Sequence, residues 1–510
     1  MTGHSRFFWT LFVLLSIMSA VPAAEEPFPN VLFIMVDEMR WDALAANRSD
    51  NVYKTPALDR LAAEGTRFTH AYTVAAVCVS SRHSFFTSRY SHVHGATDNQ
   101  VPIRTAQILL PGIMKQLGYE TAISGKLHFS PNDKDYDFDY FRSFGNEGPK
   151  TLQTWPQYLS QKYTPAQRQL KDAPFRGDKL GGDLGRLEYP KEDTQSFWIT
   201  DRAVEFLHIR DKSKPFFLFV SYLEPHSPSH LAEPYWSQFL AEKDRVKLPS
   251  TFVPGLAPKP EDGITRNGRA WVSDPEIAKS MTAAYHAKVK HVDDNIERLL
   301  DGLKKAGLDK NTLIIFTADH GNMLGDHNRW FKGVQYEGSI RIPLLVKAPE
   351  NSAYAETFNQ GKTVSRLIES IDVMPTLLDI IGKPLPDDPG FQGKSFTKLV
   401  AGNDPGWKNI VYSERRGMLV RDSKYKLIKN EEESGGGYLL FDLENDPEET
   451  QNLAGETALQ SVFEELKKKL DAWQKEEPPV PKYPGLEPKF PPAEEKRNKE
   501  QRRDRRQPAQ

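Results

Sequence analysis

The sequence predicts an α/β protein in which a mostly parallel, mixed sheet lies between layers of helices. Apolar, β-branched runs of strand length alternate along the chain with helical segments, which is typical of doubly wound sheets. These runs are followed directly by polar residues, at the point where each strand would end. Because open α/β sheets bind ligands at the carboxyl ends of their strands, the same pattern places a candidate site at one edge of the sheet.

The main domain is expected to hold five such strands and two clear helices. The first strand is the apolar run Asn30–Val36, and a helix is expected over Pro56–Glu64, with proline at its first position and Gly65 at its end. A long amphipathic helix is expected over Met281–Ala306. The further strands are expected at Tyr119–Ser124, Pro215–Tyr222, Thr312–Thr317 and Arg341–Val346.

The sequence pattern changes near Trp407, where short strands replace the alternation of strand and helix. We expect a meander followed by an amphipathic helix over Gln460–Lys475, which together form a small C-terminal α+β subdomain. The predicted divisions are residues 1–24, a signal peptide; 25–405, the main domain; 406–476, the α+β subdomain; and 477–510, a disordered tail. The meander strands are expected at Asn409–Glu414, Met418–Arg421, Tyr425–Lys429 and Tyr438–Asp442.

Composition and the N-terminus narrow the class of protein. The 510 residues carry 67 basic and 69 acidic side chains, a net charge of −2, so no overall field favours nucleic acid. Arg6, the apolar run Phe7–Met18 and the small residues before Ala24 are typical of a secretory signal, with an uncleaved anchor as the alternative. The mature protein is therefore expected to be periplasmic or secreted, without a membrane span. Since Cys78 is the single cysteine, a disulfide within the chain is excluded.

Two polar, Pro- and Gly-interrupted segments, residues 146–196 and 229–274, are expected to be insertions over the sheet edge. Their aromatic side chains could stack on a sugar ring or simply pack, and the candidates are Trp155, Tyr158, Tyr235 and Trp236. The charged run Glu494–Arg506 follows a Pro-rich stretch and is typical of a solvated tail.

Acidic residues and a histidine follow two of the expected strands. Asp37 and Glu38 end the first strand, and Asp319 and His320 follow the strand at Thr312–Thr317. Carboxylates with few soft ligands suit a hard divalent cation such as Ca²⁺ or Mg²⁺. A cap or turn is the alternative for any single acidic residue, but two such strand ends favour a metal site.

A second group of residues is suited to binding an anion. The segment from Ser80 to Thr87 reads as the start of a helix, where backbone N–H groups favour an anion and lower the pKa of a nearby thiol such as Cys78. A free cysteine is otherwise most often a small buried residue. Singly, each lysine is more often solvated and each histidine merely hydrogen-bonded, but together these residues describe a site for anion hydrolysis: Arg82, Lys126, Lys332, His128 and His226.

The run Cys78-Val79-Ser80-Ser81-Arg82 with Thr87 resembles the signature of type I sulfatases, in the alkaline phosphatase superfamily. The resemblance spans nearly the whole mature chain, and its ordered motifs are NVLFIMVDE, Gly-Lys-Leu-His, Glu-Pro-His-Ser-Pro, Thr-Ala-Asp-His-Gly and the segment from Leu440 to Glu449. In that family a maturation enzyme oxidises the cysteine to formylglycine. The resemblance thus implies an alkaline-phosphatase-like fold and hydrolysis of a sulfate ester, small or oligosaccharide.

Carried over by position, the resemblance implies a role for each candidate residue. A metal, usually Ca²⁺, with Mg²⁺ or Mn²⁺ as alternatives, would be held by Asp37, Asp319, His320 and modified Cys78, with Glu38 in the second acidic position. Arg82 would orient the formylglycine hydrate, and Lys126 and Lys332 would hold the sulfate. His226 would assist the leaving alcohol, and His128 would take the proton from the remaining hydroxyl.

The chain departs from the family pattern at three positions. Ser80 stands where proline or alanine is usual, Ser88 stands where glycine is usual, and Glu38 replaces a shorter carboxylate. Two other functions fit the same residues. One is a phosphodiester or phosphonate monoester hydrolase of the same superfamily, and the other is a sulfoglycan-binding protein in which Cys78 stays a thiol.

Overall fold

The computed structural model describes most of the chain between residues 28 and 489. The expected signal peptide and the charged run Glu494–Arg506 lie outside the described residues. The described ranges are 28–48, 52–103, 106–145, 147–148, 153–175, 184–257, 272–431 and 436–489.

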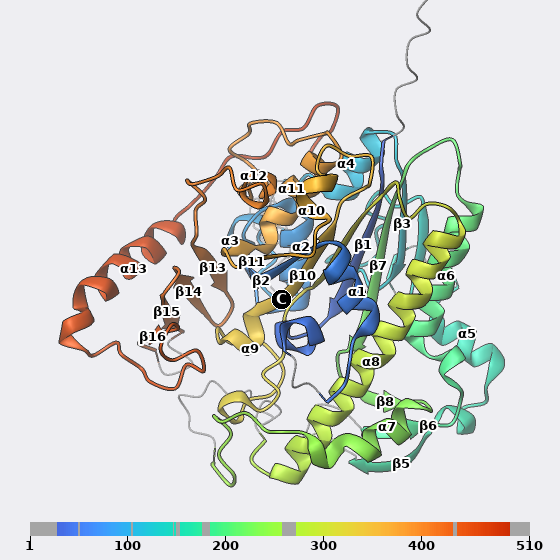
Figure 1. Cartoon of the computed structure of the whole chain (residues 1–510), viewed down its shortest axis with the longest axis horizontal. Coiled ribbons are helices and arrows are strands. Elements are labelled where there is room, and N and C mark those ends of the chain that lie inside the picture. The colour runs from blue at the N-terminus through green and yellow to red at the C-terminus, as the bar shows by residue number, and fades with distance from the viewer. Residues whose placement is uncertain are drawn as a thin grey trace, which may run out of the picture.

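A nine-stranded sheet forms the centre of the described structure (Figure 1). Its strands are β1 (Asn30–Asp37), β2 (Thr66–Tyr72), β3 (Glu120–Gly125), β4 (Tyr140–Ser143), β7 (Phe216–Pro225), β9 (Thr312–Ala318), β10 (Arg341–Lys347), β11 (Lys362–Val364) and β12 (Ile368–Glu369). The order is β11-β2-β10-β9-β1-β7-β3-β4, and β12 also pairs with β2. Only β10 runs antiparallel to its neighbours in this sheet, so the expected mixed, mostly parallel sheet is confirmed.

The five strands expected in the main domain are all present, and four end one residue beyond their predicted limits. The exception is β7, which extends three residues further, to Pro225. All eight residues of β1 are buried, because β1 has a parallel neighbour on each side and helices over both faces. This burial explains why its sequence is a continuous apolar run rather than an alternating one.

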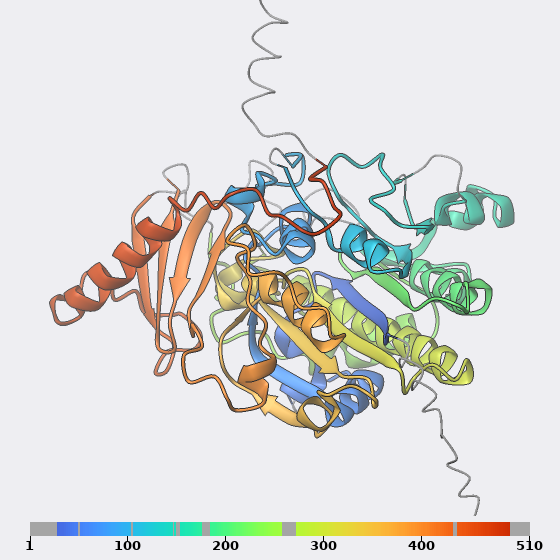
Figure 2. The ribbon, with the colours of Figure 1, turned by 90° about the horizontal axis from the view of Figure 1, so that it is seen from above.

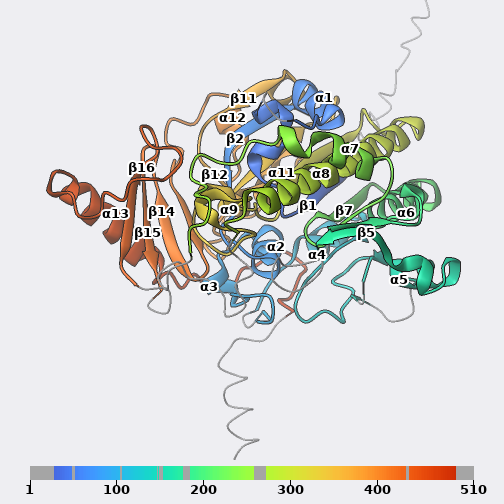
Figure 3. The same ribbon diagram turned by 90° about the horizontal axis from the view of Figure 1, so that it is seen from below.

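Helices cover both faces of the sheet, with α1 (Pro56–Glu64), α6 (Gln195–Ile209) and α8 (Pro275–Lys305) on one face and α2 (Cys78–Thr87) and α4 (Leu110–Gln116) on the other (Figure 3). The helix at Pro56–Glu64 is as predicted. The long helix begins at Pro275 rather than Met281, because the Asp274 side chain accepts hydrogen bonds from the first backbone N–H groups, 2.8 Å from Glu276 N.

The C-terminal subdomain is an antiparallel meander beside the main sheet, with α13 (Gln460–Trp473) on its outer side (Figure 2). Leu466, Leu470 and Trp473 are buried on the inner face of α13, as the apolar spacing predicts. The predicted limits of the domains at 405 and 476 stay predictions. The meander strands are β13 (Val411–Glu414), β14 (Gly417–Arg421), β15 (Tyr425–Asn430) and β16 (Tyr438–Asp442).

Residues 477–489, at the start of the expected tail, lie among the described residues, and the predicted disorder of the tail stays a prediction. Residues 477–489 run back over the main domain, where Tyr483 and Leu486 pack against its core. Backbone contacts hold this segment at both ends: Arg89 donates to the carbonyl of Pro478 at 3.1 Å, and Lys489 N donates to Gln107 O at 3.0 Å.

The two insertions form a small satellite layer. It contains a three-stranded sheet of β5 (Leu170–Phe175), β6 (Leu184–Leu187) and β8 (Ser229–Leu231), with α5 (Trp155–Lys162) and α7 (Tyr235–Glu242) beside it. Tyr235 and Trp236 are buried, and Trp155 donates its indole N–H to Asp193 O at 3.0 Å, so these aromatic side chains pack. In the described part of the chain, no helix is long and apolar enough to cross a membrane.

Candidate active site

Four adjacent strands of the central sheet deliver the predicted site residues to one edge. Asp37 ends β1, Asp319 follows β9, Lys126 follows β3 and His226 follows β7. In the sheet these strands lie in the order β9-β1-β7-β3. The convergence expected from the strand-end pattern is therefore present, and parallel packing explains it, since the carboxyl ends of parallel strands meet at one edge.

Asp37, Cys78, Asp319 and His320 form a buried group whose ligand atoms all lie within 4.8 Å of one another. Cys78 Sγ lies 3.1 Å from His320 Nε2 and 3.8 Å from Asp37 Oδ1. His320 Nδ1 lies 3.0 Å from the carbonyl of Gly321, which can only accept, so Nδ1 carries the proton and Nε2 can present a lone pair to the group. Two carboxylates, an imidazole nitrogen and Sγ fit a divalent cation.

Arg82 contacts both carboxylates of this group. Its Nε donates to Asp319 Oδ2 at 2.8 Å, and its Nη2 lies 3.2 Å from Asp37 Oδ2. Nη1 donates to Lys126 O at 2.8 Å and to Ser221 Oγ at 2.9 Å, and the side chain is fully buried. The guanidinium fork therefore fixes the position of both carboxylates, which a single ammonium could not do.

The charges around Cys78 favour its ionised form. Burial by itself would raise the pKa of the thiol, but the ammonium groups of Lys126 and Lys332 hold that pKa well below its usual range, and His128 adds a hydrogen bond. Lys126 also pairs with Asp37, whose pKa is lowered despite its burial. A negative group at the position of Cys78 Sγ is thus stabilised by its surroundings.

Glu38 does not belong to the group that contains Cys78. Its Oε2 accepts from Lys332 Nζ at 2.7 Å, and its Oε1 accepts from Asn322 Nδ2 at 2.7 Å. It forms a second group with Asp37 and His226 instead. The structure therefore brings four of the five expected metal ligands together and places Glu38 beside Lys332. Asn322 was not anticipated, although it lies only two residues after His320.

His226 lies beside Lys332, with its Nε2 2.7 Å from Lys332 Nζ. Its Nδ1 lies 2.6 Å from the Ser227 carbonyl, so Nδ1 carries a proton and Nε2 is the atom that can exchange one with a substrate. Lys288 on α8 supports this loop from the buried side and donates to His226 O at 2.7 Å. Sequence reasoning did not identify Lys288, because a lysine within an amphipathic helix is normally on its solvated face.

Backbone strain occurs at two residues of the site. Glu38 has φ 69° and His128 has φ 51°, both in the left-handed region that side chains other than glycine and asparagine rarely adopt. Strained residues of this kind gather at functional sites, where the surrounding structure holds them. His128 Nδ1 is buried and has no hydrogen-bond partner among the described residues, which leaves it able to take a proton.

The helix expected near Ser80 is α2, and it begins at Cys78 itself. Asn99 Oδ1 accepts from the backbone N–H of Val79 at 3.2 Å, so an asparagine from the following loop caps the helix. Ser88 ends it with φ 54°, in the left-handed region. This conformation explains why glycine would suit the position, and here a serine adopts it while its Oγ donates to Ile371 O at 2.8 Å.

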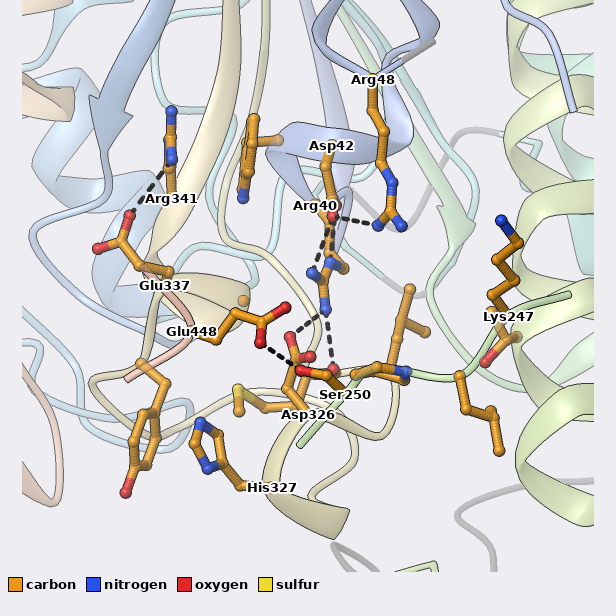
Figure 4. Close-up of a pocket in the computed structure, with 18 of the residues that line it drawn as sticks. Arg40, Asp42, Arg48, Lys247, Ser250, Asp326, His327, Glu337, Arg341 and Glu448 are labelled. Atoms are coloured by element: carbon orange, nitrogen blue, oxygen red, sulfur yellow. Dashed lines mark hydrogen bonds and ion pairs between the residues drawn. The ribbon is translucent and has the colours of Figure 1, made fainter. Parts of the chain in front are cut away.

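A separate cavity of about 500 Å³ lies beside the loop that carries Asn322 (Figure 4). Residues 245–250 of the second insertion line one side of it, but none of the ten predicted site residues does. Several of the labelled charges pair with one another: Arg40 contacts Asp326 at 2.6 Å and Asp42 at 2.7 Å. These charges therefore fix the shape of the cavity.

Comparison with known proteins places this site in a family. The sulfatase family matches residues 29–383, and the family described as "N-sulphoglucosamine sulphohydrolase, C-terminal" matches residues 325–476. The arylsulfatase of Clostridium perfringens is 29% identical over 467 residues, which cover 88% of this chain and 93% of that protein. The N-acetylglucosamine-6-O-sulfatase of Bacteroides thetaiotaomicron is 26% identical over 546 residues, covering 92% and 91%.

A solved structure shares the fold. The phosphonate monoester hydrolase of Agrobacterium radiobacter superposes with a TM-score of 0.70 at 24% identity, covering 89% of this chain and 100% of that one. At this identity the likeness concerns the fold alone. Together, the family match over most of the chain, the strand-end site and the α/β fold lead to one conclusion. The chain belongs to the sulfatase family of sulfuric ester hydrolases.

Proposed function

We propose that this sulfatase hydrolyses a sulfate ester on a sulfated sugar, with formylglycine made from Cys78 as the nucleophile. The observation that carries the proposal is the position of Cys78, at the start of a buried helix and 3.1 Å from His320 Nε2, within a ring of cationic groups. The sulfated-sugar substrate is supported by the relative from Bacteroides thetaiotaomicron.

The residues that would hold a divalent cation are Asp37, Asp319, His320 and the modified Cys78. Ca²⁺ is the proposed ion, with Mg²⁺ or Mn²⁺ as alternatives, since the donors are mainly carboxylate oxygens. When bound, the cation would supply Lewis-acid polarisation of the nucleophile and of the sulfate oxygens. Glu38 is left to hold Lys332 and to accept from Asn322.

In the proposed reaction, one hydroxyl of the formylglycine hydrate gives its proton to the carboxylate of Asp37, whose Oδ1 lies 3.8 Å from Cys78 Sγ, and attacks sulfur, and the bond from sulfur to the sugar oxygen breaks. His226 Nε2 gives a proton to the departing alcohol, and Lys332 lies beside it to replace that proton. Lys126 and Lys332 stabilise the sulfate oxygens, while Arg82 keeps the nucleophile and both carboxylates aligned.

The second hydroxyl completes the cycle. His128 takes its proton, the carbonyl re-forms, and the bond between the formylglycine carbon and the sulfate oxygen breaks. Sulfate leaves with that bonding pair, and water then hydrates the aldehyde again. Release of sulfate therefore needs no second attack at sulfur. This route requires the second hydroxyl of a geminal diol, which a serine side chain does not have.

The proposed activity requires that Cys78 is oxidised and that the protein reaches its sulfated substrate. A maturation enzyme must oxidise Cys78, although Ser80 replaces the proline or alanine usual in the motif. The N-terminal sequence supports export to the periplasm or beyond the cell, where sulfated polysaccharides are met. Since conversion in this family generally precedes folding, Cys78, which is 1% exposed in the fold, would be oxidised before it is buried.

The alternative is a phosphodiester or phosphonate monoester hydrolase, supported by the fold shared with the enzyme of Agrobacterium radiobacter. A panel of position-defined sulfated sugars, with matched aryl sulfate, phosphodiester and phosphonate monoester substrates, distinguishes the two. Release of sulfate at a higher kcat/KM than any phosphorus ester supports the proposal. Faster turnover of a phosphorus ester overturns it, and binding of sulfated sugar without turnover by the native protein indicates a non-catalytic protein.

A further inference from the structure

A hairpin of the C-terminal subdomain reaches the edge of the catalytic site. The turn between β13 and β14 carries two adjacent arginines, Arg415 and Arg416. The backbone of Glu414, just before the turn, donates to Val74 O at 3.0 Å and bridges to Ala75, on the segment that leads into Cys78. The turn is therefore tied directly to the chain that enters α2.

One further segment of the site, the residues that follow Lys332, contacts both the backbone and the side chain of Arg415. Gln335 Nε2 donates to Arg415 O at 2.9 Å, which fixes the backbone. A Cβ placed on Gly333 would lie 2.0 Å from Arg415 Nη1, so the guanidinium occupies the space that a side chain would fill next to Lys332. Gly333 has φ 96°, which also favours glycine there.

The guanidinium of Arg415 has an N–H donor without an acceptor among the described residues. Its Nη2 lies 3.3 Å from Asp98 Oδ1, and Asp98 is the one carboxylate within ion-pair distance of it among the described residues. Its Nε is buried and has no hydrogen-bond partner there. The Asp98 side chain is 45% exposed, so solvent weakens its hold on the charge. Glu414 contacts a different partner, because its Oε1 accepts from His92 N at 2.8 Å, and no ion pair between Glu414 and Arg415 is present among the described residues.

Arg415 and Cys78 are close enough for their charges to interact. Burial lowers the pKa of Arg415, while Asp98 and Cys78 act in the opposite direction. Asn99, the neighbour of Asp98, caps the helix that begins at Cys78. The guanidinium thus lies between the loop that caps Cys78 and the loop that carries Lys332, at the rim of the proposed sulfate site.

We propose that Arg415 is a specificity-determining residue that binds a second anionic group, a carboxylate or another sulfate, on the sugar that carries the scissile sulfate ester. This inference rests on the proposed function and deepens it, since it selects sugars with a second anionic group over sugars whose only charge is the scissile sulfate. The guanidinium fork suits either oxyanion, because both present two oxygens in one plane. Arg416, the next residue in the turn, is exposed.

The test compares sulfated sugars in matched pairs that differ in one neighbouring group. One pair is glucosamine 2-N,6-O-disulfate and N-acetylglucosamine 6-sulfate, and the other is a sulfated uronic acid and its methyl ester. The native enzyme is expected to prefer the charged member of at least one pair by about 10- to 100-fold in kcat/KM, as a charge-assisted hydrogen bond provides. The pair that shows the preference identifies the group.

Arg415→Gln is expected to abolish that preference, and Arg415→Lys to restore only part of it. Arg416→Gln and Asp98→Asn are matched controls that should keep it. If Arg415 merely ties the hairpin to Asp98, Asp98→Asn and Arg415→Gln will change both members of a pair alike. That result, or no preference in the native enzyme, overturns the inference. Thermal midpoints show which variants are folded.

A binding measurement tests the role of Arg415 independently of whether the native enzyme hydrolyses the sugar. Calorimetry on the Cys78→Ser protein, with the same pairs, measures recognition without turnover. Tighter binding of the charged member that is lost in the added Arg415→Gln change supports the inference even if the native enzyme hydrolyses neither sugar. Equal binding of both members in every variant refutes it, whatever the activity of the native enzyme.

Discussion

Arg82→Met is expected to destabilise the fold strongly, because this arginine is the common partner of two buried carboxylates. The side chains of Arg82, Asp37 and Asp319 are all fully buried, so water cannot replace the lost charge without opening the site. Methionine keeps most of the side-chain volume and removes the guanidinium. The change therefore tests the charge and the hydrogen bonds rather than the packing.

The magnitude follows from the contacts that are lost. Asp319 loses a donor at 2.8 Å and Asp37 one at 3.2 Å, and Ser221 Oγ and Lys126 O lose theirs. Removing one partner of a buried ion pair costs about 3–5 kcal/mol, because the remaining charge is left without compensation. Lys126 still pairs with Asp37, so Asp319 carries most of the effect.

Urea unfolding followed by fluorescence measures this loss as a shift of the midpoint at unchanged slope. Arg60→Met is the matched control: Arg60 lies 3.4 Å from Glu297, but both side chains are more than 40% exposed, so the same change should cost about 1 kcal/mol or less. A loss of similar size in both variants would refute the claim that Arg82 is the electrostatic support of the site.

The other predictions concern the metal, the leaving group and pH. A chelator should abolish activity and lower the thermal midpoint of the native protein, and added Ca²⁺ should restore both. The thermal midpoint of the Asp319→Asn variant should change with neither the chelator nor Ca²⁺. A native midpoint that the chelator leaves unchanged contradicts the metal site. His226→Gln should lower the rate of hydrolysis of alkyl sulfates by about 10²- to 10⁴-fold, and that of 4-nitrophenyl sulfate far less, because nitrophenolate leaves without a proton. Equal losses of rate for both substrates contradict the role of His226 as the general acid. Burial lowers the pKa of Lys288 in the folded protein from 10.5 to about 8. Between these two pH values the unfolded chain binds more protons at this residue than the folded chain does. The contribution of Lys288 to the free energy of unfolding therefore increases as pH rises from about 8 to 10.5. Lys288→Met should remove that rise from urea midpoints measured across this range, and an unchanged pH dependence would show that Lys288 does not contribute it.

The strand-end residues could be predicted because burial leaves a simple trace in the sequence. A strand such as β1, covered on both faces, must be apolar throughout, and the first polar residues after it, Asp37 and Glu38, mark its carboxyl end. Parallel strands then bring such residues together without further information. The same logic places Asp319, His320 and Lys126 at the site.

What the sequence could not provide were side-chain directions and contacts between distant segments. Glu38 follows Asp37 directly, yet its left-handed backbone turns its carboxylate to Lys332 rather than to Cys78. Lys288 is buried because α8 packs under the His226 loop, which helical periodicity alone does not reveal. Arg415 reaches the site through a hairpin of another subdomain, and no local pattern marks that approach.

Formylglycine at position 78 is the central claim, and the mass of the peptide that spans Val77 to Arg82 tests it most directly. The measurement uses protein purified from its native host, or from a host with the maturation enzyme, with its sulfatase activity recorded. The account predicts a peptide in which the thiol of Cys78 is replaced by an aldehyde oxygen, in a fraction that rises in proportion to specific activity. Full sulfatase activity with Cys78 entirely as the thiol would contradict it.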